Sequence, residues 1–230
     1  MAHEYAEELT ERFLRYVAVP SESDPSVGVV PSTEGQRKLA ELLAAELQEL
    51  GLVEIEVNEH AILTALLPGN VSGAPTIGYV AHLDTVPVAL SSEVHPQIIR
   101  YEGGDVCLNA EKDIWIRLAE HPELGDYVGQ DIIFTDGTSV LGADNKAAIA
   151  NVMTMLHVMT SKQLPHGDIR VAFVPDEEIG LCGSKLLDLN KFKVDFAYTI
   201  DCCAVGELVY ETFNAGSVVF DIKGVTAHPM

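Results

Sequence analysis

Three apolar segments of this chain run into side chains that commonly bind metal ions, and this pattern restricts the possible folds more than any other feature. The segments are residues 76–81 before His82, residues 169–174 before Glu177 and Glu178, and residues 196–200 before Asp201. Continuous apolar runs of this length are typical of strands covered on both faces of a sheet. Because ligands bind at the C-terminal edge of open α/β sheets, we predict an α/β fold with these side chains at one edge.

The rest of the hydrophobic pattern predicts helices and two more strands. The predicted helices are residues 5–17, 33–51, a segment from Asp144 or Asn145 to Met159, and 185–188, and the strands are residues 53–57 and 61–67. Thr33 and Gln36 have the spacing of a capping box, and Asp144 or Asn145 is the expected N-cap of the third helix. Residues 85–135 have weak periodicity, so we expect a long excursion with a little strand structure.

Composition excludes several classes of partner. Fourteen basic and 35 acidic residues give a net charge of -21, which repels nucleic acids and anionic membrane surfaces. The N-terminus lacks the pattern of a signal peptide, and no segment is long and apolar enough to cross a membrane. The four cysteines fit no zinc-finger spacing, and the adjacent pair Cys202-Cys203 is a poor disulfide candidate. We therefore expect a cytoplasmic protein without nucleic-acid or membrane partners.

The residue types at the predicted sheet edge favour a metal site. Histidine combined with carboxylates suits zinc, manganese or cobalt, and a carboxylate such as Asp144 can bridge two ions. Asp84 is placed to orient the imidazole of His82, and one glutamate of the acidic pair can transfer protons while the other binds metal. Each residue alone has a simpler interpretation: a structural histidine, a helix cap, or acids in a solvated turn. Their shared placement favours a metal-assisted hydrolase.

Four ordered segments also resemble the metallopeptidase family of aminoacylases, carboxypeptidases and aminotripeptidases, and most closely its aminotripeptidases. These segments are YVAHLDTVP, TDGTSVLGADNKAA, HGDIRVAFVPDEEIG and YTIDCCAVGELVYETFNA. The resemblance implies a zinc-binding α/β catalytic domain interrupted by a smaller α+β lid domain, through which many members form dimers. It divides this chain into residues 1–213, part of the catalytic domain, and residues 214–230, the start of the lid domain.

The resemblance also implies a role for each matching residue. His82, Asp144 and Asp201 would bind the first zinc, with Asp144 bridging to a second zinc held by Glu178, and Asp84 would orient His82. Glu177 would take a proton from the attacking water and return it to the leaving amine when the first peptide bond of a tripeptide is hydrolysed. His228 would hold the small peptide substrate or help stabilise the oxyanion.

Two departures from the family pattern affect this interpretation. The family supplies a further histidine to the second zinc from far downstream, and this sequence ends at Met230. We therefore expect the N-terminal part of a longer enzyme, with one complete zinc site of the two and with little or no activity by itself. The second departure is Cys202-Cys203, where relatives usually carry small residues. We interpret these cysteines as small core residues, with capture of metal by their thiolates as the alternative.

Two other functions stay open at this level. One is a related amidohydrolase acting on N-acyl amino acids or dipeptides, against which the segment GELVYETFNA argues. The other is a metal-binding fragment without catalysis, which the missing downstream histidine would favour.

Overall fold

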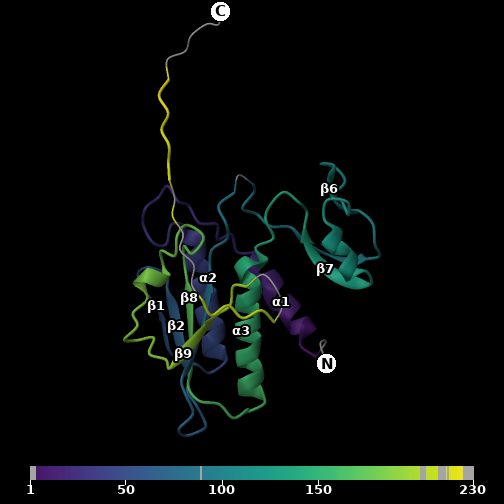
Figure 1. Cartoon of the computed structure of the whole chain (residues 1–230). Helices are drawn as coiled ribbons and strands as arrows, with labels where there is room; N and C mark the ends of the chain where they lie inside the picture. Colours follow the sequence, from purple (N-terminus) through teal and green to yellow (C-terminus); the bar gives the residue numbers. More distant parts are fainter. Residues whose placement is uncertain (1–3, 89, 203–205, 212–215, 217, 225–230) are drawn as a thin grey trace, which may run out of the picture.

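A mixed five-stranded sheet covered by helices forms the main body of the computed structural model (Figure 1). The structure describes residues 4–88, 90–202, 206–211, 216 and 218–224. The sheet has the order β1-β2-β8-β3-β9. Its strands are β1 (Val53–Val57), β2 (Leu63–Leu67), β3 (Ile77–His82), β8 (Ile169–Val174) and β9 (Phe196–Thr199). The α/β class predicted from the sequence is confirmed.

The directions of the strands bring the candidate metal ligands that follow β3, β8 and β9 to one edge of the sheet. β3 runs parallel to both β8 and β9, with Val80 opposite Ala172 on one side and Thr199 on the other. His82 pairs with Val174, the last residue of β8. The loops that follow these three strands therefore leave the sheet side by side, as expected for parallel strands.

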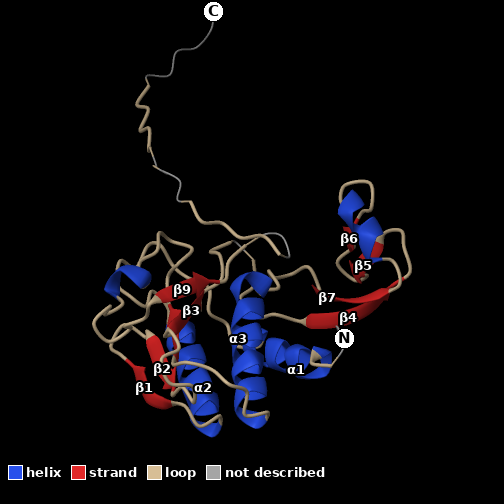
Figure 2. Cartoon of the chain, turned by 60° about the horizontal axis from the view of Figure 1, so that its bottom comes forward, coloured by secondary structure: helices blue, strands red, loops and turns tan. Residues whose placement is uncertain are grey.

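Two of the three long helices, α2 (Glu34–Glu49) and α3 (Ala143–Ser161), pack against the sheet and bury its apolar side chains, and the third, α1 (Ala6–Val17), packs against α3. Figure 2 shows α2 and α3 next to each other beside the sheet. Leu39, Leu43 and Met153 are fully buried in a core that also contains Val171 and Phe173 from β8. β8 is buried along nearly its whole length, which agrees with its continuous apolar sequence.

Residues 86–141 form an arm on the other side of α3 from the sheet (Figures 1 and 2). It contains β4 (Pro96–Tyr101) paired with β7 (Gln130–Thr135), β5 (Val106–Asn109) paired with β6 (Ile114–Ile116), and the short 3-10 helix η1 (Pro122–Tyr127). Tyr101, Val106, Leu124 and Phe134 form its own small core. The expected excursion with a little strand structure is therefore confirmed, although the bounds of its strands were not predicted, because two-stranded ribbons are half-exposed and leave only a weak apolar pattern.

The predicted helices and strands of the main body are otherwise confirmed, apart from their caps. Thr33 is the N-cap residue of α2, yet its side chain makes no capping hydrogen bond. Thr33 Oγ1 instead donates to the carbonyl of Glu22, and Gln36 turns toward the sheet edge. Asp144 and Asn145 have non-helical backbone angles, and the residue before α3 is Gly142. The short helix near residue 185 is η2 (Ser184–Leu186).

The predicted second domain falls largely outside the described residues. Of residues 214–230, only 216 and 218–224 are described, and they belong to no helix or strand. His228 and Cys203 also lie outside the described residues, and Cys202 is exposed, so its interpretation as a small core residue is wrong. Within the described part of the chain, no helix is long and apolar enough to span a membrane.

Candidate metal centre

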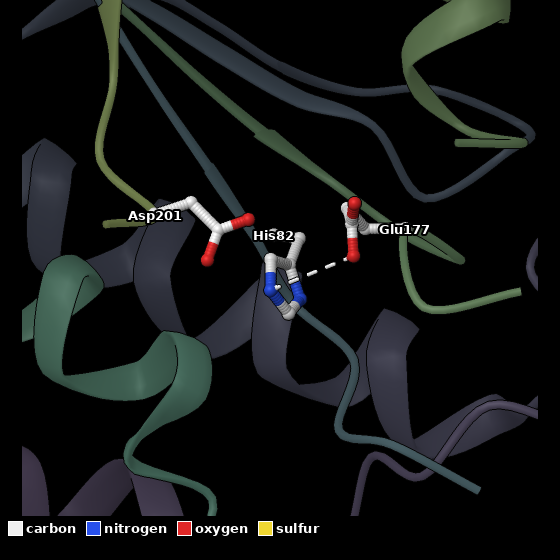
Figure 3. Close-up of side chains that lie close together, drawn as sticks. All are labelled: His82, Glu177 and Asp201. Carbon is white, nitrogen blue, oxygen red and sulfur yellow. Dashed lines mark ion pairs between the residues drawn. The ribbon is translucent and has the colours of Figure 1, made fainter. Parts of the chain in front are cut away.

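His82 lies at the centre of a group of carboxylates beyond the ends of β3, β8 and β9. Its imidazole is buried, and its Nε2 atom lies 2.9 Å from Oδ1 of Asp144 and 3.9 Å from Oε2 of Glu177. Figure 3 shows the ring between Glu177 and Asp201. The sequence prediction that residues of these loops meet is therefore confirmed for the described part of the chain.

Asp84 fixes both the ring and the neighbouring loop. The Nδ1 atom of His82 lies 3.0 Å from the carbonyl oxygen of Asp84 and 3.4 Å from its carboxylate. With oxygen acceptors on this side, the proton of a neutral imidazole belongs on Nδ1, and Nε2 is left as a ligand atom. The fully buried carboxylate of Asp84 also accepts hydrogen bonds from the backbone N–H groups of Glu177 (2.9 Å) and Glu178 (3.1 Å).

Two overlapping sets of side chains are close enough to hold a metal ion. One set is His82, Asp144 and Glu178, and the other is His82, Glu177 and Asp201; within each set the ligand atoms lie within 4.8 Å of one another. Neither set equals the trio of His82, Asp144 and Asp201 that the resemblance implies for the first zinc. The structure thus brings together the five predicted residues, while their division between two ions stays a prediction.

The electrostatics of this cluster favour a bound cation. Burial raises the pKa of Glu177, Glu178 and Asp201, and the negative charges of neighbouring carboxylates raise these pKa values further. Among the described residues, no lysine or arginine forms an ion pair with any of the three or with Asp144. Carboxylates that are close together and not paired with lysine or arginine, with an imidazole Nε2 among them, match the ligand chemistry of zinc.

The same environment also raises the pKa of His82, which favours the charged form of its imidazole. Burial opposes the charged imidazolium, but the hydrogen bond with Asp84 and the charges of Asp84, Glu177 and Asp144 together raise the pKa of His82 to about 9. A metal ion must therefore displace a proton from His82 at neutral pH.

The sequence patterns assign no role to two buried polar residues that lie close to the candidate ligands in sequence. Asp176, which directly precedes the two glutamates, is fully buried and accepts hydrogen bonds from Ser32 and Gln36. Lys146 is also buried, with its Nζ donating to the carbonyl of Val19 at 2.8 Å, and burial lowers its pKa to about 8. A capping-box spacing drew attention to Gln36, but no local signal links it to Asp176.

Comparison with solved structures identifies the fold. An aminopeptidase PepT from Bacillus cereus ATCC 10987 matches with a TM-score of 0.61 and 25% identity, covering 86% of this chain and 44% of that chain. A tripeptidase from Staphylococcus aureus subsp. aureus Mu50 matches with a TM-score of 0.60, also at 25% identity and the same coverage. An M20 family metallo-carboxypeptidase from Sulfolobus solfataricus shares the fold, with a TM-score of 0.52 and 20% identity over 84% of this chain and 37% of that chain. The chain has the fold of an M20-type metallopeptidase catalytic domain.

Sequence comparison is more specific. Peptidase T of Escherichia coli strain K12 is 47% identical over 97% of this chain and 55% of its own length. A peptidase T-like protein of Yersinia pestis is 61% identical, over 98% of this chain and 55% of its own length. No protein-family model matches the chain. The chain is therefore similar to peptidase T over nearly its whole length, and it spans about half the length of the curated relatives it matches.

Proposed function

We propose that this chain carries the metal-binding and proton-transfer residues of an aminopeptidase that releases the N-terminal residue from tripeptides. The observation that carries the proposal is the meeting of His82 with Asp144, Glu177, Glu178 and Asp201 at the C-terminal edge of the sheet. The similarity to peptidase T and to a solved tripeptidase supports the substrate class.

Zinc is the proposed cofactor, with two ions in a complete site. His82, Asp144 and Asp201 would hold one ion, and Asp144 and Glu178 would contribute to the other. Bound zinc supplies a Lewis acid that polarises the peptide carbonyl and activates water for attack. Because both three-residue sets found among the described residues share His82, we expect one tightly bound ion per 230-residue chain.

Glu177 is the proposed proton carrier. Burial and the surrounding carboxylates raise its pKa, which suits a group that accepts a proton from water and later donates it to the leaving amine. Asp84 holds His82 in the correct tautomer and fixes the backbone of both glutamates. His228 is proposed to contact substrate or the developing oxyanion.

We propose a cytoplasmic enzyme that acts on small peptides and forms a homodimer through its lid domain, without binding nucleic acid or membranes. Three cysteines in the described part of the chain are free, which suits a reducing compartment.

A cobalt titration combined with a peptide panel tests the proposal. Cobalt(II) replaces zinc in such sites and reports its ligand geometry through visible absorption. We expect one tight site per chain and, after extension with the remaining segment of the Yersinia relative, hydrolysis of tripeptides but not of dipeptides or N-acyl amino acids. Activity of the extended chain only on dipeptides or acyl amino acids would favour the related amidohydrolase instead. Metal binding without any hydrolysis by the extended chain would favour a non-catalytic metal-binding protein.

A further inference from the structure

Asp176 is held by more hydrogen bonds than a turn residue needs. It lies between β8 and the two glutamates, its side chain is fully buried, and its φ of 55° is in the left-handed region. Aspartate adopts this conformation more readily than most residues, because its short polar side chain can form hydrogen bonds nearby. The hydrogen bonds around Asp176 therefore help to hold the backbone here.

These contacts come from the start of α2 and the residues before it. Oδ2 of Asp176 accepts a hydrogen bond from the backbone N–H of Ser32 at 2.8 Å, and Oδ1 accepts one from Nε2 of Gln36 at 2.7 Å and one from the Ser32 hydroxyl. The backbone N–H of Asp176 donates to Oε1 of Gln36 at 2.9 Å. Gln36 is itself fully buried. Four hydrogen bonds thus join Asp176, the first residue of the loop that carries Glu177 and Glu178, to Ser32 and Gln36.

The same N-terminal region also holds the loop that follows His82. Ser21 Oγ donates to the carbonyl of Leu83 at 2.7 Å, and the backbone of Ser23 donates to the carbonyl of Thr85 at 3.1 Å. The backbone of Thr85 donates to Ser21 in return, at 3.2 Å. We call residues 20–33 the N-terminal segment. This segment is therefore hydrogen-bonded to Leu83 and Thr85, which follow His82, and through Ser32 to Asp176, which precedes Glu177 and Glu178.

We infer that Asp176 is a positioning residue: its carboxylate binds Ser32 and Gln36 and thereby fixes Glu177 and Glu178 relative to His82 in the geometry that a metal ion requires. This inference rests on the proposed metal site. Asp84 holds the same loop from the opposite side through the N–H groups of Glu177 and Glu178. Without the hydrogen bonds of Asp176, side-chain contacts would hold this loop only through Asp84. The side chains of Glu177 and Glu178 would then no longer keep one orientation relative to His82.

Asp176→Asn tests this inference in the 230-residue chain. An amide has the shape of the carboxylate but sets an N–H₂ group against donors of Ser32 or Gln36. We expect cobalt(II) to bind at least tenfold more weakly and its visible absorption bands to shift. The matched control is Asp168→Asn, because exposed Asp168 lies before the other end of β8 and accepts a hydrogen bond from the backbone of Gly69 at 2.7 Å. We expect this control to bind cobalt(II) as the parent chain does.

A second change separates positioning from general stability. In the double variant Asp176→Asn/Gln36→Glu, the new amide can donate to the new carboxylate, while the backbone N–H at position 176 keeps its acceptor. We expect this variant to recover at least half of the lost affinity on a logarithmic scale. Far-UV circular dichroism and the melting temperature show that each variant is folded when it is titrated. If Asp176→Asn does not fold, Gln36→Met, which removes the contacts at similar volume, is titrated instead with the same expectation.

The possible results separate the positioning role of Asp176 from the proposed metal site on which it rests. No cobalt(II) binding by the parent chain would overturn the proposed metal site and the inference with it. Binding by the parent together with equal binding by the folded Asp176 or Gln36 variant would leave the metal site standing and overturn the positioning role. A lower melting temperature without a change in affinity or spectrum would likewise assign Asp176 a structural role only.

Discussion

Glu177 and Glu178 are adjacent in sequence but face different neighbours, which allows their roles to be separated experimentally. Glu178 groups with His82 and Asp144, whereas Glu177 lies toward His82 and Asp201. If Glu178 is the ligand, Glu178→Gln should weaken cobalt(II) binding at least tenfold, about 1.4 kcal/mol. Glu177→Gln should change the affinity less than threefold and, in the extended chain, abolish peptide hydrolysis. Isothermal titration and the peptide assay measure the two effects.

The control for this pair is Glu41→Gln on the exposed face of α2. It removes the same charge far from the site, so neither affinity nor hydrolysis should change. The reverse pattern, with metal lost on substitution of Glu177 and retained on substitution of Glu178, would show that the two glutamates have exchanged roles.

His82 gives the metal-free chain a specific pH dependence. Its pKa is 6.5 in an unfolded chain and about 9 in the fold, despite burial, because of Asp84 and the nearby carboxylates. A group with a raised pKa stabilises the fold fully below the unfolded value, and this stabilisation disappears as the pH rises through the folded value. The free energy of unfolding should therefore fall by up to roughly 3 kcal/mol between about pH 6.5 and 9. The raised carboxylate pKa values act in the same direction at lower pH.

Urea unfolding of the metal-free chain across this pH range measures the effect. His82→Gln should remove most of the slope, whereas His121→Gln, an exposed histidine on the arm, should leave it unchanged. At about pH 7.5, metal binding should release about one proton per ion, seen as a dependence of the titration enthalpy on the buffer. Stability that rises with pH in the metal-free chain would contradict the charged state assigned to His82.

At the scale of elements, the contact between α2 and the N-terminal segment supports the site. A methyl group on Gly35, near the start of α2, would lie 1.7 Å from the carbonyl oxygen of Pro20. Gly35→Ala must therefore push the segment away from the helix, and Ser21 follows directly after Pro20. We expect a loss of about 2 to 4 kcal/mol in the free energy of unfolding and at least threefold weaker cobalt(II) binding. Gly125→Ala on the arm, where the space is open, is the control and should change neither quantity. Weaker folding with unchanged metal affinity would show that the segment does not support the site.

The strands that carry the candidate ligands could be predicted from the sequence, whereas the contacts that support them could not. Continuous apolar runs predicted β3 and β8, and the parallel direction of β3, β8 and β9 then placed the residues after each strand together, so the candidate ligands followed from local patterns. For the arm, the same patterns predicted an excursion with a little strand structure but not the bounds of its strands, because these strands bury only one face. The bonds of Asp176 to Gln36 and Ser32 join residues 140 and 144 positions apart. No local pattern carries such a pairing, so the support of the site required the three-dimensional structure.

At the scale of the whole molecule, the arm lies between two site residues in sequence but has a core of its own. His82 precedes it and Asp144 follows it, while the arm's small core of Tyr101, Val106, Leu124 and Phe134 is separate from the main core. Only a few arm residues, such as Ile133 on β7, contact the main core. The main fold and the metal site should therefore not depend on the outer part of the arm.

Shortening the arm tests this independence. Tyr101 and Gln130 are paired at the ends of β4 and β7, so replacing residues 102–129 with Asn-Gly should join the two strands through a two-residue turn and keep Ile133 in place. We expect cobalt(II) affinity within threefold of the parent chain and a single cooperative unfolding transition, measured by titration and urea denaturation. The core residues Tyr101 and Phe134 lose partners, so some loss of solubility is expected; adding Tyr101→Thr and Phe134→Thr should restore it. A soluble, folded variant that no longer binds cobalt(II) would show that the arm holds the metal site in shape, because its two ends lead directly to His82 and Asp144.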